Sequence, residues 1–125
     1  TFHLDPASLD VKNNQGAFGA FAVLVSDYPH SRFAADALAR MHYLRDLFAR
    51  HQLIIANYYY KRHAYVAAIN RASTVVVHYN GTHSTVPALD LLVNCYQRLG
   101  LAKLQHRTQR ILDATRMAAA TTRTS

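Results

Sequence analysis

Several residue types are scarce or missing in this sequence, and each absence excludes a class of protein. Cys95 is the only cysteine, so an internal disulfide framework and a cysteine-based zinc finger are both excluded. Four glycines and three prolines among 125 residues exclude collagen, a disordered linker and a turn-rich β-sandwich. No apolar run approaches the roughly 18 residues of a membrane-spanning helix. The chain starts without Met or a recognisable signal segment, so we expect no targeting signal, in a mature protein or an excised fragment.

Negative charge is scarce as well. Glutamate is absent, and seven Asp face fourteen Lys and Arg, of which eleven are Arg. The resulting net charge of +7 favours acidic partners, nucleic acid or an anionic surface. Apolar and aromatic residues, by contrast, make up half of the sequence, which is enough for a packed core. The length predicts a single domain.

The longest uninterrupted segment is helical in its pattern. No glycine or proline occurs from His30 to Asn80, and apolar residues recur there at helical spacing. We expect one long helix over residues 31–62, with Ser31 as its N-cap, or two helices that meet near Arg50. Asp46 and Arg50 are expected to pair on its wet face, since residues four apart are neighbours on a helix.

Shorter helices are predicted on both sides of the long one. They cover residues 13–27, 65–78, 86–99 and 101–117, with an irregular lead-in over 1–12, a loop over 80–84 and a frayed tail over 118–125. Pro87 falls in a first helical turn, where its missing N–H costs little. Gly100 is expected to end a helix in the left-handed conformation.

The apolar pattern repeats along the chain. A shift of 51 residues places ten small or apolar positions in register, among them Leu38 on Leu89 and Leu44 on Cys95. A shift of 36 residues places Tyr60 on Tyr96. Repeated helical hairpins indicate an all-α fold, an α-solenoid with one long central helix.

One segment resembles the centre of a tetratricopeptide repeat. It reads Tyr-Tyr-Lys-Arg-His-Ala-Tyr-Val-Ala-Ala-Ile over residues 59–69. The small Ala68 would let two helices cross closely, while Tyr59 and Tyr60 would pack between hairpins and leave Tyr58 exposed. His63 stands where the repeat normally has Gly, and it would adopt a left-handed conformation at some cost.

A narrower resemblance covers nearly the whole chain. The segments over residues 28–37, 40–45, 58–62, 64–72 and 95–101 resemble, in order and spacing, the BamD family of outer-membrane β-barrel assembly lipoproteins, also called competence lipoproteins. The family protein is about twice as long, so residues 1–117 would be the C-terminal repeats of such a protein and residues 118–125 a flexible tail. The family's lipid-bearing Cys is absent here.

The resemblance implies a scaffold without catalytic residues, metal or cofactor. The family's C-terminal repeats dock on the periplasmic POTRA domain of BamA nearest the barrel, and other lipoproteins of the machine are further expected partners. The family's contact Arg corresponds to Arg71, in the Ala-Ile-Asn-Arg segment, and a guanidinium suits this role because it binds carboxylates bidentately. With Asn70 and Tyr58 it forms the candidate partner-binding site. The expected location is the periplasmic face of the outer membrane, reached through a lipid anchor outside this chain.

Two other functions remain open at the level of sequence. A generic tetratricopeptide adaptor would bind peptides in its concave groove, and a nucleic-acid-binding module would use the cations of the last helix, Lys103, Arg107 and Arg110. Nucleic acid is not the expected partner, because a charged terminal helix is usually solvated. The eight histidines lack the i,i+4 spacing of a helical zinc pair, so no metal site is expected.

Overall fold

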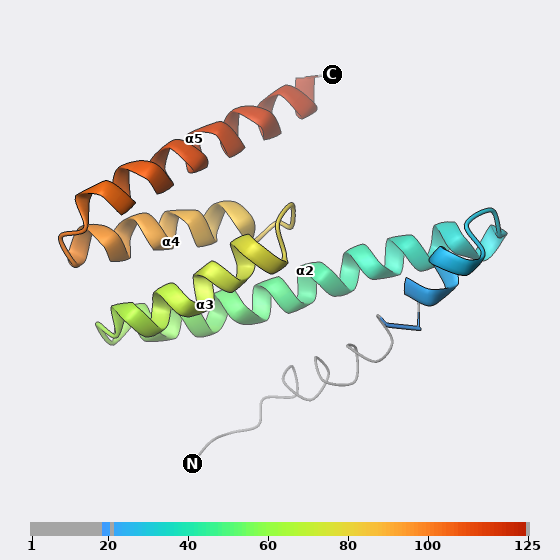
Figure 1. The fold of residues 1–125 in the computed structure, drawn as a ribbon, viewed down its shortest axis with the longest axis horizontal. Helices are drawn as coiled ribbons and strands as arrows, with labels where there is room; N and C mark the ends of the chain where they lie inside the picture. The colour runs from blue at the N-terminus through green and yellow to red at the C-terminus, as the bar shows by residue number, and fades with distance from the viewer. Residues whose placement is uncertain (1–18, 21, 125) are drawn as a thin grey trace, which may run out of the picture.

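The computed structural model describes residues 19–20 and 22–124, and in this range the chain is a series of helices joined by short turns (Figure 1). The elements are α2 (Arg32–Lys61), α3 (Tyr65–His78), α4 (Thr85–Arg98) and α5 (Ala102–Thr124). Residues 22–27 form a further helical segment before α2. The predicted all-α, repeat-like fold is confirmed. The predicted lead-in over 1–12 and the first part of the helix predicted over 13–27 lie outside the described residues.

Helix α2 is one continuous helix of 30 residues, so the alternative of two helices meeting near Arg50 is wrong. Its length is about 45 Å at ~1.5 Å per residue. Ser31 has an extended backbone, and its Oγ accepts a hydrogen bond of 3.1 Å from the backbone N–H of Phe33. The predicted N-cap is therefore confirmed, and it satisfies one of the unpaired N–H groups of the first turn.

The helices form two successive hairpins, α2–α3 and α4–α5. Helix α3 packs against α2 and α4, and α4 packs against α5 and touches α2. The first part of α2 extends beyond the ends of α3 and α4, with the segment over residues 22–27 beside it (Figure 1). Among the helices described, none combines the length and the apolar character needed to cross a membrane.

Both hairpin turns contain a residue with a left-handed backbone, as predicted. His63 has φ 62° between α2 and α3, and Gly100 has φ 71° between α4 and α5. The N–H groups of His63 and Ala64 donate to the carbonyls of Tyr60 and Tyr59, which closes the last turn of α2. A left-handed residue is the usual way to end a helix and reverse the chain.

Replacing Gly100 by alanine is expected to lower the free energy of unfolding by about 1–2 kcal/mol, the cost of a left-handed backbone for a residue with a Cβ. An added Cβ at Gly100 would meet no atom within 4 Å, so the cost comes from the backbone and not from a clash. Gly100→Asn should cost less, because asparagine adopts this conformation more readily. Urea denaturation measures both, and equal losses would contradict the conformational explanation.

The core lies where α2, α3 and α4 meet. Small side chains dominate it: Ala56, Ala68, Ala72 and Ala88 are completely buried, as expected for closely crossing helices. Leu89, Leu112, Val75 and Cys95 are the largest fully buried side chains. Burial raises the pKa of the Cys95 thiol to about 11, because the apolar surroundings disfavour the thiolate.

Two further sequence predictions differ from the structure, one on the burial of a leucine and one on the end of the last helix. Leu38, one of the apolar residues that recur at helical spacing over this segment, is 44% exposed, because it lies near the start of α2, the part that extends away from α3 and α4 (Figure 1). The last helix continues to Thr124, so its predicted end near Met117 was too early and residues 118–124 are helical. The division into a repeat domain over 1–117 and a flexible tail stays a prediction.

Candidate functional site

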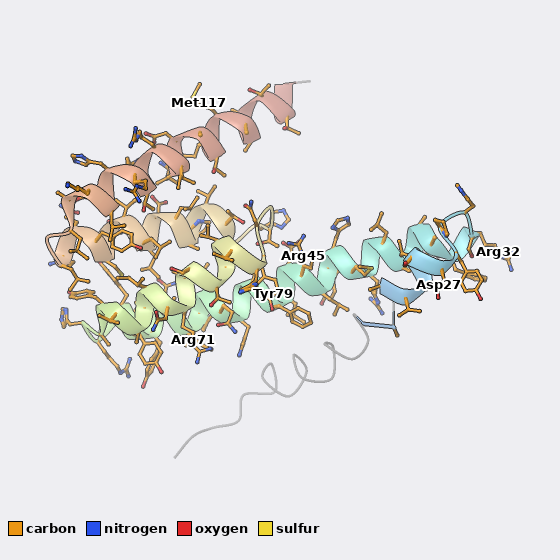
Figure 2. The ribbon with its side chains drawn as sticks, in the orientation of Figure 1. Asp27, Arg32, Arg45, Arg71, Tyr79 and Met117 are labelled. Atoms are coloured by element: carbon orange, nitrogen blue, oxygen red, sulfur yellow. The ribbon has the colours of Figure 1, made fainter. Side chains whose placement is uncertain are left out.

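Arg71 lies on the side of α3 that faces α2 (Figure 2). It is half-buried, and its Nη1 donates a hydrogen bond of 3.1 Å to Oε1 of Gln52 on α2. This bond orients the guanidinium but does not neutralise it. Among the described residues, the ion pairs are His83–Asp46 and Arg116–Asp90, so Arg71 has no carboxylate partner within this part of the chain. A guanidinium carries five N–H donors, and most of those of Arg71 are available to a partner.

Asn70 is the exposed neighbour of Arg71 on α3. Its backbone carbonyl accepts a hydrogen bond of 3.0 Å from the Thr74 hydroxyl, one turn further along the helix. Its side-chain amide makes no hydrogen bond within the described residues, so both its donor and its acceptor face solvent. The two residues together present a charged fork and an amide at one position on α3.

Tyr58 lies near the end of α2 and is 50% exposed, as predicted, whereas Tyr59 and Tyr60 pack against the core. The guanidinium carbon of Arg62 lies 3.6 Å from the centroid of the Tyr58 ring. The Tyr58 ring also meets Tyr59 edge-on, with 5.5 Å between centroids. No hydrogen bond or ring contact in the described structure joins Tyr58 to Arg71 or Asn70. Arg71 and Asn70 are therefore neighbours along α3, with no side-chain hydrogen bond between them in the described structure, whereas the Tyr58 ring has Arg62 as its neighbour.

A link that sequence reasoning missed connects α2 to the loop over residues 80–84. The backbone N–H of His83 donates to Oδ1 of Asp46 at 3.0 Å, and Nδ1 of the same histidine lies 3.3 Å from Oδ2. Arg45 donates to the carbonyl of Asn80 at 3.0 Å. The predicted Asp46–Arg50 ion pair is therefore wrong: Asp46 binds a loop 37 positions away instead.

The same link borders a half-open cavity of about 160 Å³. Its lining combines α2 and the loop: Tyr43, Asp46, Leu47, Arg50, His83 and Ser84. No buried side-chain nitrogen or oxygen lacks a hydrogen-bond partner in the part of the chain that the structure describes. That part also contains no group of three or more His, Cys, Asp or Glu residues that could hold a metal ion.

Comparison with known proteins places this geometry in a family. Residues 2–112 match the family model YfiO, described as an outer membrane lipoprotein. A protein of Haemophilus influenzae named "Outer membrane protein assembly factor BamD" is 41% identical over 113 residues, which are 90% of this chain and 43% of that protein. The proteins of the same name from Neisseria meningitidis serogroup A and Vibrio cholerae are 41% and 33% identical, over 87% and 90% of this chain and 41% and 46% of their own lengths.

The chain thus spans less than half the length of these relatives. The match nevertheless covers almost all of the chain, including α2, α3, α4, the first half of α5 and the positions of Arg71, Asn70 and Tyr58. On this basis the chain belongs to the YfiO family of outer-membrane lipoproteins, the family of the BamD assembly factors.

Proposed function

We propose that this chain is a non-catalytic scaffold unit of the outer-membrane β-barrel assembly machinery, and that it docks the barrel-proximal POTRA domain of BamA. The names of its relatives support a role in outer-membrane protein assembly. The fold supports a scaffold, because stacked helical hairpins offer extended surfaces for protein contacts. The periplasmic face of the outer membrane is the proposed location, reached through a lipid anchor in the full-length protein.

The docking proposal rests on the surroundings of the Arg71 guanidinium. This group is half-buried and held by Gln52, and no carboxylate of the described chain neutralises it. An arginine fixed in this way loses little conformational freedom when it meets a carboxylate of a partner, and it can bind both oxygens of that carboxylate. Asn70 adds an unoccupied amide beside it, while Tyr58 would extend the contact toward the end of α2.

Titration of the purified chain with the barrel-proximal POTRA domain of its cognate BamA tests this function. We expect saturable binding that weakens as salt is added, because the exposed part of a charged contact is screened. No binding by a chain that circular dichroism shows to be folded would contradict the proposal. Binding that survives loss of Arg71 but fails when residues of the concave groove are changed would favour the peptide-adaptor alternative.

A further inference from the structure

The two hairpin turns lie at the same end of the molecule (Figure 1). We call this region the turn end and define it as residues 58–65 and 98–104. The two parts are linked because α2 packs against α4, and the Tyr60 side chain of α2 raises the pKa of Arg98, the last residue of α4. The exposed side chains of the two hairpin turns therefore lie close together at this end.

Positive charge gathers at the turn end, and no acidic residue of the described part of the chain lies beside it. The cations are all exposed: Lys61, Arg62, Arg98 and Lys103. Helix α3 contains no acidic residue. Along the other three helices, the nearest described acids are Asp46, Asp90 and Asp113, which a rise of ~1.5 Å per residue places about 22, 12 and 15 Å away. These distances exceed or match the screening length at physiological salt, so the charge of the turn end is not cancelled.

Tyrosines, and not carboxylates, hold the two arginines in place. The Arg62 guanidinium lies over the Tyr58 ring, with its carbon 3.6 Å from the centroid, and its Nη1 donates to the Tyr58 carbonyl at 3.4 Å. Arg98 interacts with the Tyr60 side chain. A cation–π contact or a neutral hydrogen bond orders a guanidinium while leaving its net charge intact. Both arginines are thus positioned and remain available to an anion.

Apolar side chains project beside these cations. Leu99, Leu101 and Leu104 are 41%, 42% and 39% exposed around the turn at Gly100. The same turn carries Arg98 and Lys103, so aliphatic and cationic groups alternate within seven residues. This combination is typical of segments that rest on a membrane surface, where aliphatic groups enter the boundary of the acyl chains and cations meet the phosphates.

We propose that the turn end binds a phosphate-bearing lipid surface, with the four cations at the level of the headgroups and the exposed leucines beneath them. A stable protein interface buries ~800 Å² of surface on each partner. A lipid surface needs no such area, because each cation near it contributes separately. The match to an outer-membrane lipoprotein family supports the presence of such a surface nearby. The turn end shares Tyr58 with the candidate partner-binding site but contains neither Arg71 nor Asn70.

Vesicle flotation with the 125-residue chain tests the proposal. We expect binding to vesicles of phosphatidylcholine mixed with phosphatidylglycerol, loss of that binding at high salt, and little binding to phosphatidylcholine alone. Two independent double variants, Lys61→Gln with Arg62→Gln and Arg98→Gln with Lys103→Gln, should each lower the partition coefficient roughly twenty-five-fold, since each cation contributes roughly a five-fold factor. Adding Leu101→Ser to either double variant should lower the partition coefficient by a further several-fold.

The matched control is Arg32→Gln with Arg40→Gln, which removes the same charge from exposed positions at the other end of α2. It should leave the partition coefficient nearly unchanged. An equal loss in this control would overturn the proposal, because net charge and not the turn end would then govern binding. Equal binding to uncharged vesicles would overturn it as well. Turn-end variants that still bind vesicles but no longer bind the POTRA domain of BamA would overturn it too, because the surface would then bind an acidic protein.

Discussion

Arg71→Glu is expected to weaken binding to the barrel-proximal POTRA domain by about 2–5 kcal/mol, the cost of leaving one member of a desolvated charge pair without its partner. The reversed charge would face the partner carboxylate directly, so the loss should fall in the upper part of this range. The fold should tolerate the change, because Arg71 is half-buried and its bond to Gln52 can be replaced by one in which the Gln52 amide donates. Isothermal titration calorimetry gives the difference in affinity.

Three further variants separate the role of Arg71 from general charge effects. Arg110→Glu makes the same change of charge at an exposed position on α5 and should lower affinity only slightly. Arg71→Lys keeps the charge but loses the planar fork, so it should recover only part of the affinity. Gln52→Leu removes the hydrogen bond that orients Arg71 and should cost about 0.5–1.5 kcal/mol of binding. An equal loss for Arg71→Glu and Arg110→Glu would remove Arg71 from the interface.

Local sequence signals predicted the features that depend on a few neighbouring residues. Ser31 caps α2, and Gly100 adopts a left-handed backbone, because each property is decided within one turn of helix. The left-handed backbone of His63 was predicted from the resemblance to a tetratricopeptide repeat. The absence of glycine and proline over residues 31–62 likewise accounts for a continuous α2. The family resemblance indicated where Arg71 would stand, but only the structure shows that Gln52 holds it.

Features that depend on distant residues were missed. Asp46 has Arg50 one turn away, yet it binds His83, which only the packing of α3 and α4 brings near. The end of α5 was missed for a local reason. The alanines over residues 118–120 favour helix, and the hydroxyls of Thr121 and Thr122 are satisfied within it, because they donate to the carbonyls four residues earlier. A segment that looks small and polar therefore continues the helix. The prediction of a frayed tail relied too much on the small and polar composition of this segment.

Two leucines at equivalent repeat positions differ strongly in burial. Leu38 and Leu89 occupy equivalent positions under the shift of 51 residues, yet Leu38 is 44% exposed and Leu89 is 1% exposed. The difference arises because α4 has α3 on one side and α5 on the other, whereas Leu38 lies near the start of α2, the part that extends away from α3 and α4 (Figure 1). The repeat pattern thus identifies a potential core position, and the neighbouring helices decide whether it is buried.

This pair gives the largest expected effect on stability. Leu89→Ala should lower the free energy of unfolding by about 2–5 kcal/mol, since it removes buried methyl groups and leaves a cavity among α3, α4 and α5. Leu38→Ala deletes the same atoms from a half-exposed side chain and should cost less than about 1 kcal/mol, because alanine also favours helix. Urea denaturation of the two variants measures the difference. Similar losses would mean that Leu38 is covered as Leu89 is, and that the exposed part of α2 is packed in solution.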